Sequence, residues 1–183
     1  MASTFQRTKL LSMFDAFDAD ANGYLDQRDF QALAARWNTL PRVRPGSELA
    51  TRVQNVMLGW WDHLAAHVDT DHDGRIDLEE LLVMVDLLPT MTDAVAATAE
   101  TVFDAVDTNG DGRISPTEHQ TLVDTWHGRP IDTTGVFARL DGDGDGYLDR
   151  PEFTSLWIQF WTSDTPTDPG NHLCGLLPTP DTA

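Results

Sequence analysis

Four segments of this 183-residue chain carry oxygen-bearing side chains at the same offsets around a central glycine. They read DADANGYLDQRD at 18–29, DTDHDGRIDLEE at 69–80, DTNGDGRISPTE at 107–118 and DGDGDGYLDRPE at 141–152, and are called loops one to four below. Each begins with Asp, has Gly in sixth place and ends with Asp or Glu. A hard cation such as Ca²⁺ prefers oxygen ligands gathered in this way, so the segments predict metal binding.

Calcium takes about six to eight oxygen ligands, and a twelve-residue loop supplies side chains from positions 1, 3, 5, 9 and 12 and a backbone carbonyl from position 7. Position 6 must turn sharply, which suits glycine. The pattern recurs four times, which makes it highly specific for the EF-hand calcium loop. The predicted ligands are Asp18, Asp20, Asn22, Tyr24, Asp26 and Asp29; Asp69, Asp71, Asp73, Arg75, Asp77 and Glu80; Asp107, Asn109, Asp111, Arg113, Ser115 and Glu118; and Asp141, Asp143, Asp145, Tyr147, Asp149 and Glu152.

Loop one departs from the others at its last position, where Asp29 replaces the usual Glu. Asp is one methylene shorter and is less able to reach a cation with both oxygens. A lower coordination number suits the smaller, octahedral Mg²⁺. Up to four calcium ions are therefore expected, with loop one as the weakest calcium site or a mixed calcium and magnesium site.

Apolar residues recur at helical spacing on both sides of each loop, which predicts an all-α fold of four helix–loop–helix units. Ser47, Thr92 and Asp132 are expected to cap helices. Gly128 is expected to end one helix, and Gly59 to bend another. Position 8 is apolar in every loop, so the loops should pair through short two-residue β ribbons whose side chains enter the core: Leu25, Ile76, Ile114 and Leu148.

The spacing of the loops predicts two EF-hand pairs packed into one compact bundle. The N-terminal pair spans 1–88 and the C-terminal pair spans 89–161, with a helix after loop two that closes at Pro89. The first two loops are set further apart by a linker at about 39–46, which is marked by Pro and Gly. A tail at 162–183 is expected to fold back and cover its leucines, Leu173, Leu176 and Leu177.

One position after loop three breaks the apolar pattern of the other units. The residue after the last ligand is Phe30, Leu81 or Phe153 in three units but His119 in the third. A half-buried imidazole is the simpler interpretation, and a pH-sensitive packing contact is the alternative.

The net charge of −18 is concentrated in the loops, whose side-chain positions hold seventeen of the 30 carboxylates. Such a surface is an unlikely partner for nucleic acid. No segment is long and apolar enough to span a membrane, and the N-terminus lacks a signal-peptide pattern. Cys174 is the single cysteine, which excludes an internal disulfide. A cytoplasmic monomer is expected, and the strong preference for Arg over Lys is typical of a GC-rich bacterial genome.

The chain resembles the sarcoplasmic calcium-binding protein family, and its bacterial, calerythrin-like members in particular. The resemblance rests on the four loops, the long first interval, the many aromatics and the tail SDTPTDPGN with its apolar continuation. It implies a compact bundle that acts as a calcium buffer or calcium signal modulator. Many members of that family have lost one loop, often the second, whereas here loop two is among the most complete.

Two other functions stay open. A calmodulin-like sensor would expose an apolar surface to a protein target, but the chain has only five Met. Photoproteins share the architecture, so a cavity for a hydrophobic small ligand is conceivable, lined by Trp37, Trp60, Trp61, Trp126, Trp157 and Trp161. An enzyme is not expected, because His63 and His67 are spaced i, i+4 without the Glu of a zinc protease motif or a third ligand.

Overall fold

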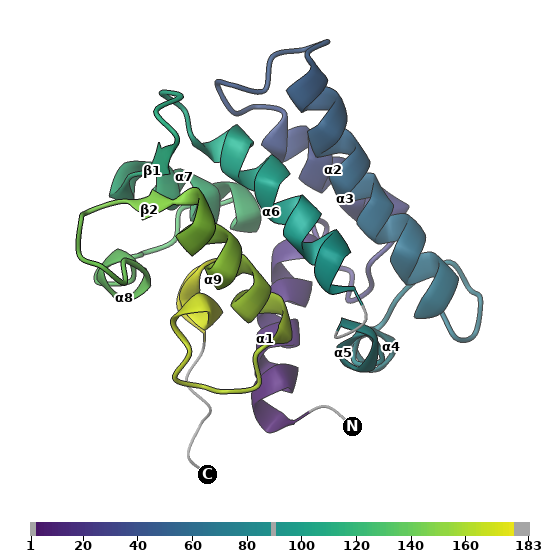
Figure 1. The fold of residues 1–183 in the computed structure, drawn as a ribbon. Helices are drawn as coiled ribbons and strands as arrows, with labels where there is room; N and C mark the ends of the chain where they lie inside the picture. Colours follow the sequence, from purple (N-terminus) through teal and green to yellow (C-terminus); the bar gives the residue numbers. More distant parts are fainter. Residues whose placement is uncertain (1–2, 89–90, 178–183) are drawn as a thin grey trace.

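The computed structural model describes residues 3–88 and 91–177 and is all-α, as predicted (Figure 1). Most of its helices flank the four loops. The elements in chain order are α1 Thr4–Phe17, α2 Gln27–Trp37, α3 Glu48–His67, α4 Leu78–Leu81, α5 Met84–Leu87, α6 Thr92–Val106, β1 Arg113–Ile114, α7 Pro116–His127, α8 Phe137–Leu140, β2 Leu148–Asp149, α9 Arg150–Thr162 and the 3₁₀ helix η2 Pro169–His172.

The loops pair as expected, loop one with loop two and loop three with loop four. A single antiparallel bridge joins Leu25 to Ile76, with N–H···O distances of 2.9 Å in both directions. The second pair has a two-residue ribbon, in which Ile114 of β1 lies opposite Leu148 of β2. All four side chains have 0% exposure, so position 8 of each loop is part of the core.

The segment after loop two differs from the predicted continuous helix. It consists of two short helices, α4 and α5, separated at Leu82 and Val83. The amide of Val83 donates to Glu80 O at 2.9 Å, and that of Val85 donates to Leu82 O at 3.3 Å. The backbone therefore changes from α-helical bonding to i→i−3 bonding, as in a 3₁₀ helix, at this point. The predicted end of this helix at Pro89 lies outside the described residues.

Two of the five predicted helix signals need correction. The helix α6 begins at Thr92 itself, with Met91 as its N-cap. Asp132 does not cap α8 but accepts the Thr134 amide at 2.9 Å in a local turn. The helix α3 continues through Gly59, and the bend expected there stays a prediction. The Ser47 cap is confirmed by its bond from Ala50 N–H at 3.1 Å, and Gly128 ends α7 with φ of +66°.

The two pairs pack against each other through aromatic side chains. Phe17 of α1 lies 4.9 Å from Trp126 of α7, measured between ring centroids. Trp60 of α3 stacks on Trp161 of α9 at 4.8 Å. Figure 1 shows α3 of the first pair and α6 of the second running side by side. One hydrophobic core therefore spans the described part of the chain.

The segment after α9 turns back onto the bundle. Leu173 and Cys174 are buried, whereas Leu176 is 50% exposed and so is not covered as the sequence suggested. His119, at 1% exposure, is fully rather than half buried. Its Nε2 lies 2.9 Å from Leu173 O, so the imidazole donates to the tail, and burial lowers the pKa of His119. The last residues of the tail, 178–183, lie outside the described residues.

Candidate metal sites in the four loops

The first ligand position of each loop is organised by the glycine at position 6. Each glycine has a left-handed φ, between +78° and +86°, which side-chain-bearing residues rarely adopt. This turn aims the glycine N–H back at the position 1 carboxylate. The bonds are Gly23 to Asp18 at 2.9 Å, Gly74 to Asp69 at 3.1 Å, Gly112 to Asp107 at 3.1 Å and Gly146 to Asp141 at 2.9 Å.

The side chains at positions 3 and 5 each accept a hydrogen bond from a backbone amide of their own loop. In loop two, Asp71 Oδ1 accepts the Asp73 amide at 3.1 Å, and Asp73 Oδ1 accepts the Arg75 amide at 2.8 Å. The same two-residue turns occur in the other loops, at Asp20, Asn22, Asn109, Asp111, Asp143 and Asp145. These turns fix the side-chain oxygens of positions 3 and 5 against the backbone of each loop.

Positions 9 and 12 form the start of the helix that leaves each loop. The position 9 residue is the N-cap and the position 12 residue is its capping-box partner at N3, so two predicted ligands are held by helix capping. The N-cap and N3 pairs are Asp26 with Asp29, Asp77 with Glu80, Ser115 with Glu118 and Asp149 with Glu152.

Two loops hold the position 12 carboxylate more firmly through a threonine at position 2. Glu80 Oε1 accepts from both the amide and the hydroxyl of Thr70, each at 2.9 Å. Glu118 Oε1 accepts from the amide of Thr108 at 2.8 Å and from its hydroxyl at 2.9 Å. These threonines were not predicted from the sequence, although the hydroxyl at position 2 of both loops is visible in it.

Asp29 occupies the position 12 place in loop one despite its shorter side chain. Its two oxygens accept from Ala19 N–H at 3.0 Å and Asp26 N–H at 2.8 Å, the positions that a longer Glu contacts in loop two. Burial raises the pKa of Asp29 more than these bonds lower it. Burial also raises the pKa of Glu80, but its hydrogen bonds outweigh that effect and the net pKa is lowered. The last ligand position of loop one is therefore filled by a shorter carboxylate that is 3% exposed.

Three loops bring trios of carboxylates together within 4.8 Å, counted between ligand oxygens. The trios are Asp18, Asp20 and Asp29; Asp69, Asp71 and Asp73; and Asp141, Asp143 and Glu152. Among the described residues, loop three forms no such trio. Asp69 Oδ1 is buried without a hydrogen-bond partner in the described part, an arrangement that is costly unless a cation or proton donor pairs with the oxygen. The donor set consists of hard oxygens and fits Ca²⁺.

The position 7 residues, expected to offer only carbonyls, also pair across the loops. The Arg75 guanidinium lies 5.5 Å from the Tyr24 ring centroid, and that of Arg113 lies 5.4 Å from the Tyr147 ring. Arg113 also lies 3.8 Å from Asp145 of loop four. Each loop pair thus has a cation–π contact at its outer edge.

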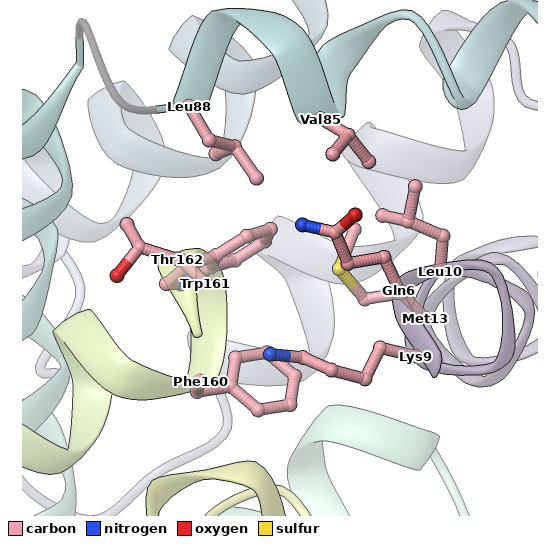
Figure 2. A pocket seen from close by; sticks show the side chains of 9 residues that line it. All are labelled: Gln6, Lys9, Leu10, Met13, Val85, Leu88, Phe160, Trp161 and Thr162. Atoms are coloured by element: carbon pink, nitrogen blue, oxygen red, sulfur yellow. The ribbon is translucent and has the colours of Figure 1, made fainter. Parts of the chain in front are cut away.

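The sequence suggested two further sites, a histidine pair and a tryptophan-lined cavity, and the structure accounts for both. His63 and His67 stack at 4.3 Å, and no third metal-binding side chain joins them among the described residues. The predicted tryptophan cavity is largely filled, because five of the six indoles are buried. A partly enclosed space of about 40 Å³ remains between α1, α5 and α9, lined in part by Lys9, Leu88 and Trp161 (Figure 2). That volume is far below the roughly 300 Å³ of small-molecule pockets.

Paired helix–loop–helix units with these oxygen sets define the class of EF-hand proteins. A family model described as EF hand matches residues 68–85, 99–123 and 134–157, and a model of an EF-hand domain pair matches 5–36. The sarcoplasmic calcium-binding protein of Scylla paramamosain is 33% identical over 157 residues, which cover 79% of this chain and 81% of the relative. The chain belongs to the sarcoplasmic calcium-binding protein family.

Bacterial proteins are also similar to this chain. Calerythrin of Saccharopolyspora erythraea is 22% identical over 166 residues, covering 87% of this chain and 94% of the relative. A Streptomyces coelicolor calcium-binding protein, whose structure is described as the structural basis for prokaryotic calcium-mediated regulation by that protein, superposes with a TM-score of 0.67 at 26% identity. The match covers 86% of this chain and 98% of that structure. The predicted resemblance to the family and to its calerythrin-like members is confirmed.

Proposed function

We propose that the protein binds Ca²⁺ at its four loops and acts as a calcium buffer or calcium signal modulator. The observation that carries the proposal is the repeated oxygen set, organised in each loop by a position 6 glycine and a capping box. Loops two, three and four would take calcium. Loop one, with the short Asp29, would be weakest or would accept Mg²⁺.

The burial of the apolar faces favours a buffer over a sensor. A sensor opens on binding calcium and offers an apolar groove to a target helix. Taking the pairs as 1–88 and 89–161, aromatic side chains of one pair contact the other, Phe17 against Trp126 and Trp60 against Trp161. Opening would separate these aromatic contacts, which are worth about 0.5–1.5 kcal/mol each beyond the area they bury. We therefore propose that the two pairs act as one compact unit.

A sensor remains the second candidate because of one surface feature. An open groove of about 320 Å³ lies between α3 and α6 and is lined in part by Val56, Trp60 and Met91. The similarity to a protein described in terms of calcium-mediated regulation supports the same alternative. A protein target would have to bind at this groove without separating the two pairs.

We do not expect the protein to act in catalysis, membrane insertion or nucleic-acid binding. No helix in the described part of the chain could cross a membrane. The net charge of −18 disfavours phosphate backbones. A monomer in the bacterial cytoplasm remains the expected setting, supported by the single, buried Cys174 and by the similarity to calerythrin.

Calcium titration of the metal-free protein, with a dye that fluoresces on apolar surfaces, distinguishes the two candidates. A buffer should take up calcium with little increase in dye fluorescence, and the same titration with Mg²⁺ serves as the control. A several-fold increase that is specific to calcium would contradict the buffer and favour the sensor.

A further inference from the structure

A basic side chain from the linker of the first EF-hand pair lies on loop three of the second pair. Arg42 Nη1 donates to the backbone oxygen of Asp107 at 2.9 Å and lies 3.5 Å from the Asp107 carboxylate. Asp107 is the position 1 ligand of loop three and has 4% exposure. The contact joins residues 65 positions apart in the sequence.

The linker fixes Arg42 in this place. Leu40 and Val43, on either side of it, are buried in the core. Val43 N–H donates to Leu40 O at 2.9 Å, so the segment forms a tight turn with Arg42 inside it. The linker that sets loops one and two further apart therefore also carries a cation to loop three.

Loop three leaves room for the guanidinium at its fourth position. A Cβ on Gly110 would lie 2.9 Å from Arg42 Nη1, whereas a Cβ on Gly144 of loop four would meet nothing within 4 Å. Position 4 has a left-handed backbone in every loop, but Ala21 and His72 adopt it in loops one and two. The backbone alone therefore does not require glycine at Gly110, whereas a Cβ there would displace the Arg42 guanidinium.

The charge of Arg42 opposes that of a bound cation. Without metal, the guanidinium partly neutralises Asp107 in the loop that has the fewest carboxylates. A Ca²⁺ ion held by Asp107 would be repelled by it at close range, although the 38% exposure of the Arg42 side chain allows solvent to screen the repulsion. The contact thus stabilises the metal-free loop relative to the calcium-loaded loop.

We propose that Arg42 is a resident cation of loop three that lowers the calcium affinity of that loop. The inference rests on the proposed calcium-binding function, because it concerns one of the four sites. It also makes the affinity of loop three depend on the first EF-hand pair, through a side chain that is not a metal ligand.

The test is a calcium titration of Arg42→Gln against Arg44→Gln, which removes the same charge from the same linker. Arg44 is exposed. Arg42→Gln should tighten loop three by about three- to tenfold, and Arg44→Gln should change it by less than about twofold. Gly110→Ala, which would displace the guanidinium, should act in the same direction as Arg42→Gln.

A double variant assigns the effect to loop three and separates the two proposals. In a Glu118→Gln background, which removes the last ligand of loop three, Arg42→Gln should leave the remaining affinities unchanged. Metal-free Arg42→Gln should also melt at a lower temperature than metal-free Arg44→Gln. Unchanged or weaker binding by loop three in Arg42→Gln would overturn the inference while calcium binding stands. A wild-type chain that takes up no calcium would overturn the proposed function itself.

Discussion

The two EF-hand pairs are built from the same repeated segment but differ in how their loops are joined and continued. The first pair meets at the single Leu25–Ile76 bridge, and the helix after loop two is broken into α4 and α5. The second pair has the ribbon of β1 and β2, and α7 and α9 each begin with Pro in their first turn and run for 12 and 13 residues.

This difference shows what holds the position 12 ligand of each loop in place. The position 12 ligand belongs to the exiting helix, so a short or broken helix gives it fewer fixed neighbours. In loop two the Thr70 hydroxyl compensates by holding Glu80 directly. Loop one has Ala19 at that position and depends on backbone bonds to Asp29 alone. The first pair is therefore expected to contain the weakest site.

Truncation at position 8 gives the largest expected effect. Ile76→Ala in the first pair and Ile114→Ala in the second each remove a side chain with 0% exposure. Each should cost about 2–5 kcal/mol of unfolding free energy, measured by denaturant unfolding in saturating calcium. A cost below about 1 kcal/mol at Ile76 alone would show that the single bridge does not pack like the ribbon.

Removal of one position 12 charge should disable one site in each pair. Glu80→Gln and Glu152→Gln each remove the predicted bidentate ligand, and each should weaken one calcium site by roughly a hundredfold, about 2.7 kcal/mol. Calorimetric titration of both variants measures the effect, with Glu79→Gln in the same helix turn as Glu80 as the control. If Glu79→Gln weakened binding equally, charge alone rather than ligation would be responsible.

Lengthening the short ligand of loop one should bring the first pair closer to the second. Asp29→Glu should raise the calcium affinity of loop one by about tenfold, about 1.4 kcal/mol, and reduce its preference for Mg²⁺. Competition titration of Ca²⁺ against Mg²⁺ measures both changes. No gain in calcium affinity would mean that the buried position of Asp29, rather than its length, limits the site.

The smallest effect concerns the contact between the first pair and the chain that follows the second. Lys9 of α1 donates to Ser163 O at 2.9 Å and Asn171 Oδ1 at 3.0 Å. Burial lowers the pKa of Lys9 to about 8 from an ordinary 10.5, despite Asp164 and Asp168, which raise it. The unfolded state then binds more protons between these values, so this group makes stability rise with pH there.

The unfolding free energy of the wild-type protein should therefore rise by about 1 kcal/mol between about pH 7.5 and pH 9, and that of Lys9→Met should not. Denaturant unfolding of both proteins across this window measures the difference. Parallel pH profiles would show that burial between α1 and the tail does not lower the pKa of Lys9.

The loops were predictable from the sequence because ligand chemistry fixes residue types at fixed offsets within twelve residues. The all-α class and the pairing of the loops followed from the apolar residues beside them. The break between α4 and α5 was not predictable, because the apolar spacing of Leu81, Met84 and Leu88 fits one helix as well as two. Asp132 failed as a cap because its side chain is satisfied by Thr134 two residues later.

Contacts between distant segments were also outside the reach of sequence reasoning. The approach of Arg42 to Asp107 depends on how the pairs dock, which no local pattern encodes. His119 stood out in the sequence, but only the fold explains it. The tail places the Leu173 carbonyl beside this position, and an apolar side chain could not donate a hydrogen bond to it.

The most direct test of four unequal calcium sites is calorimetric titration of the metal-free wild-type chain, repeated in excess Mg²⁺. Four binding events are expected, of which the weakest disappears in Mg²⁺ and in a variant with Asp29→Ala. Absence of calcium heat, or four events that are equal and insensitive to Mg²⁺, would contradict the account.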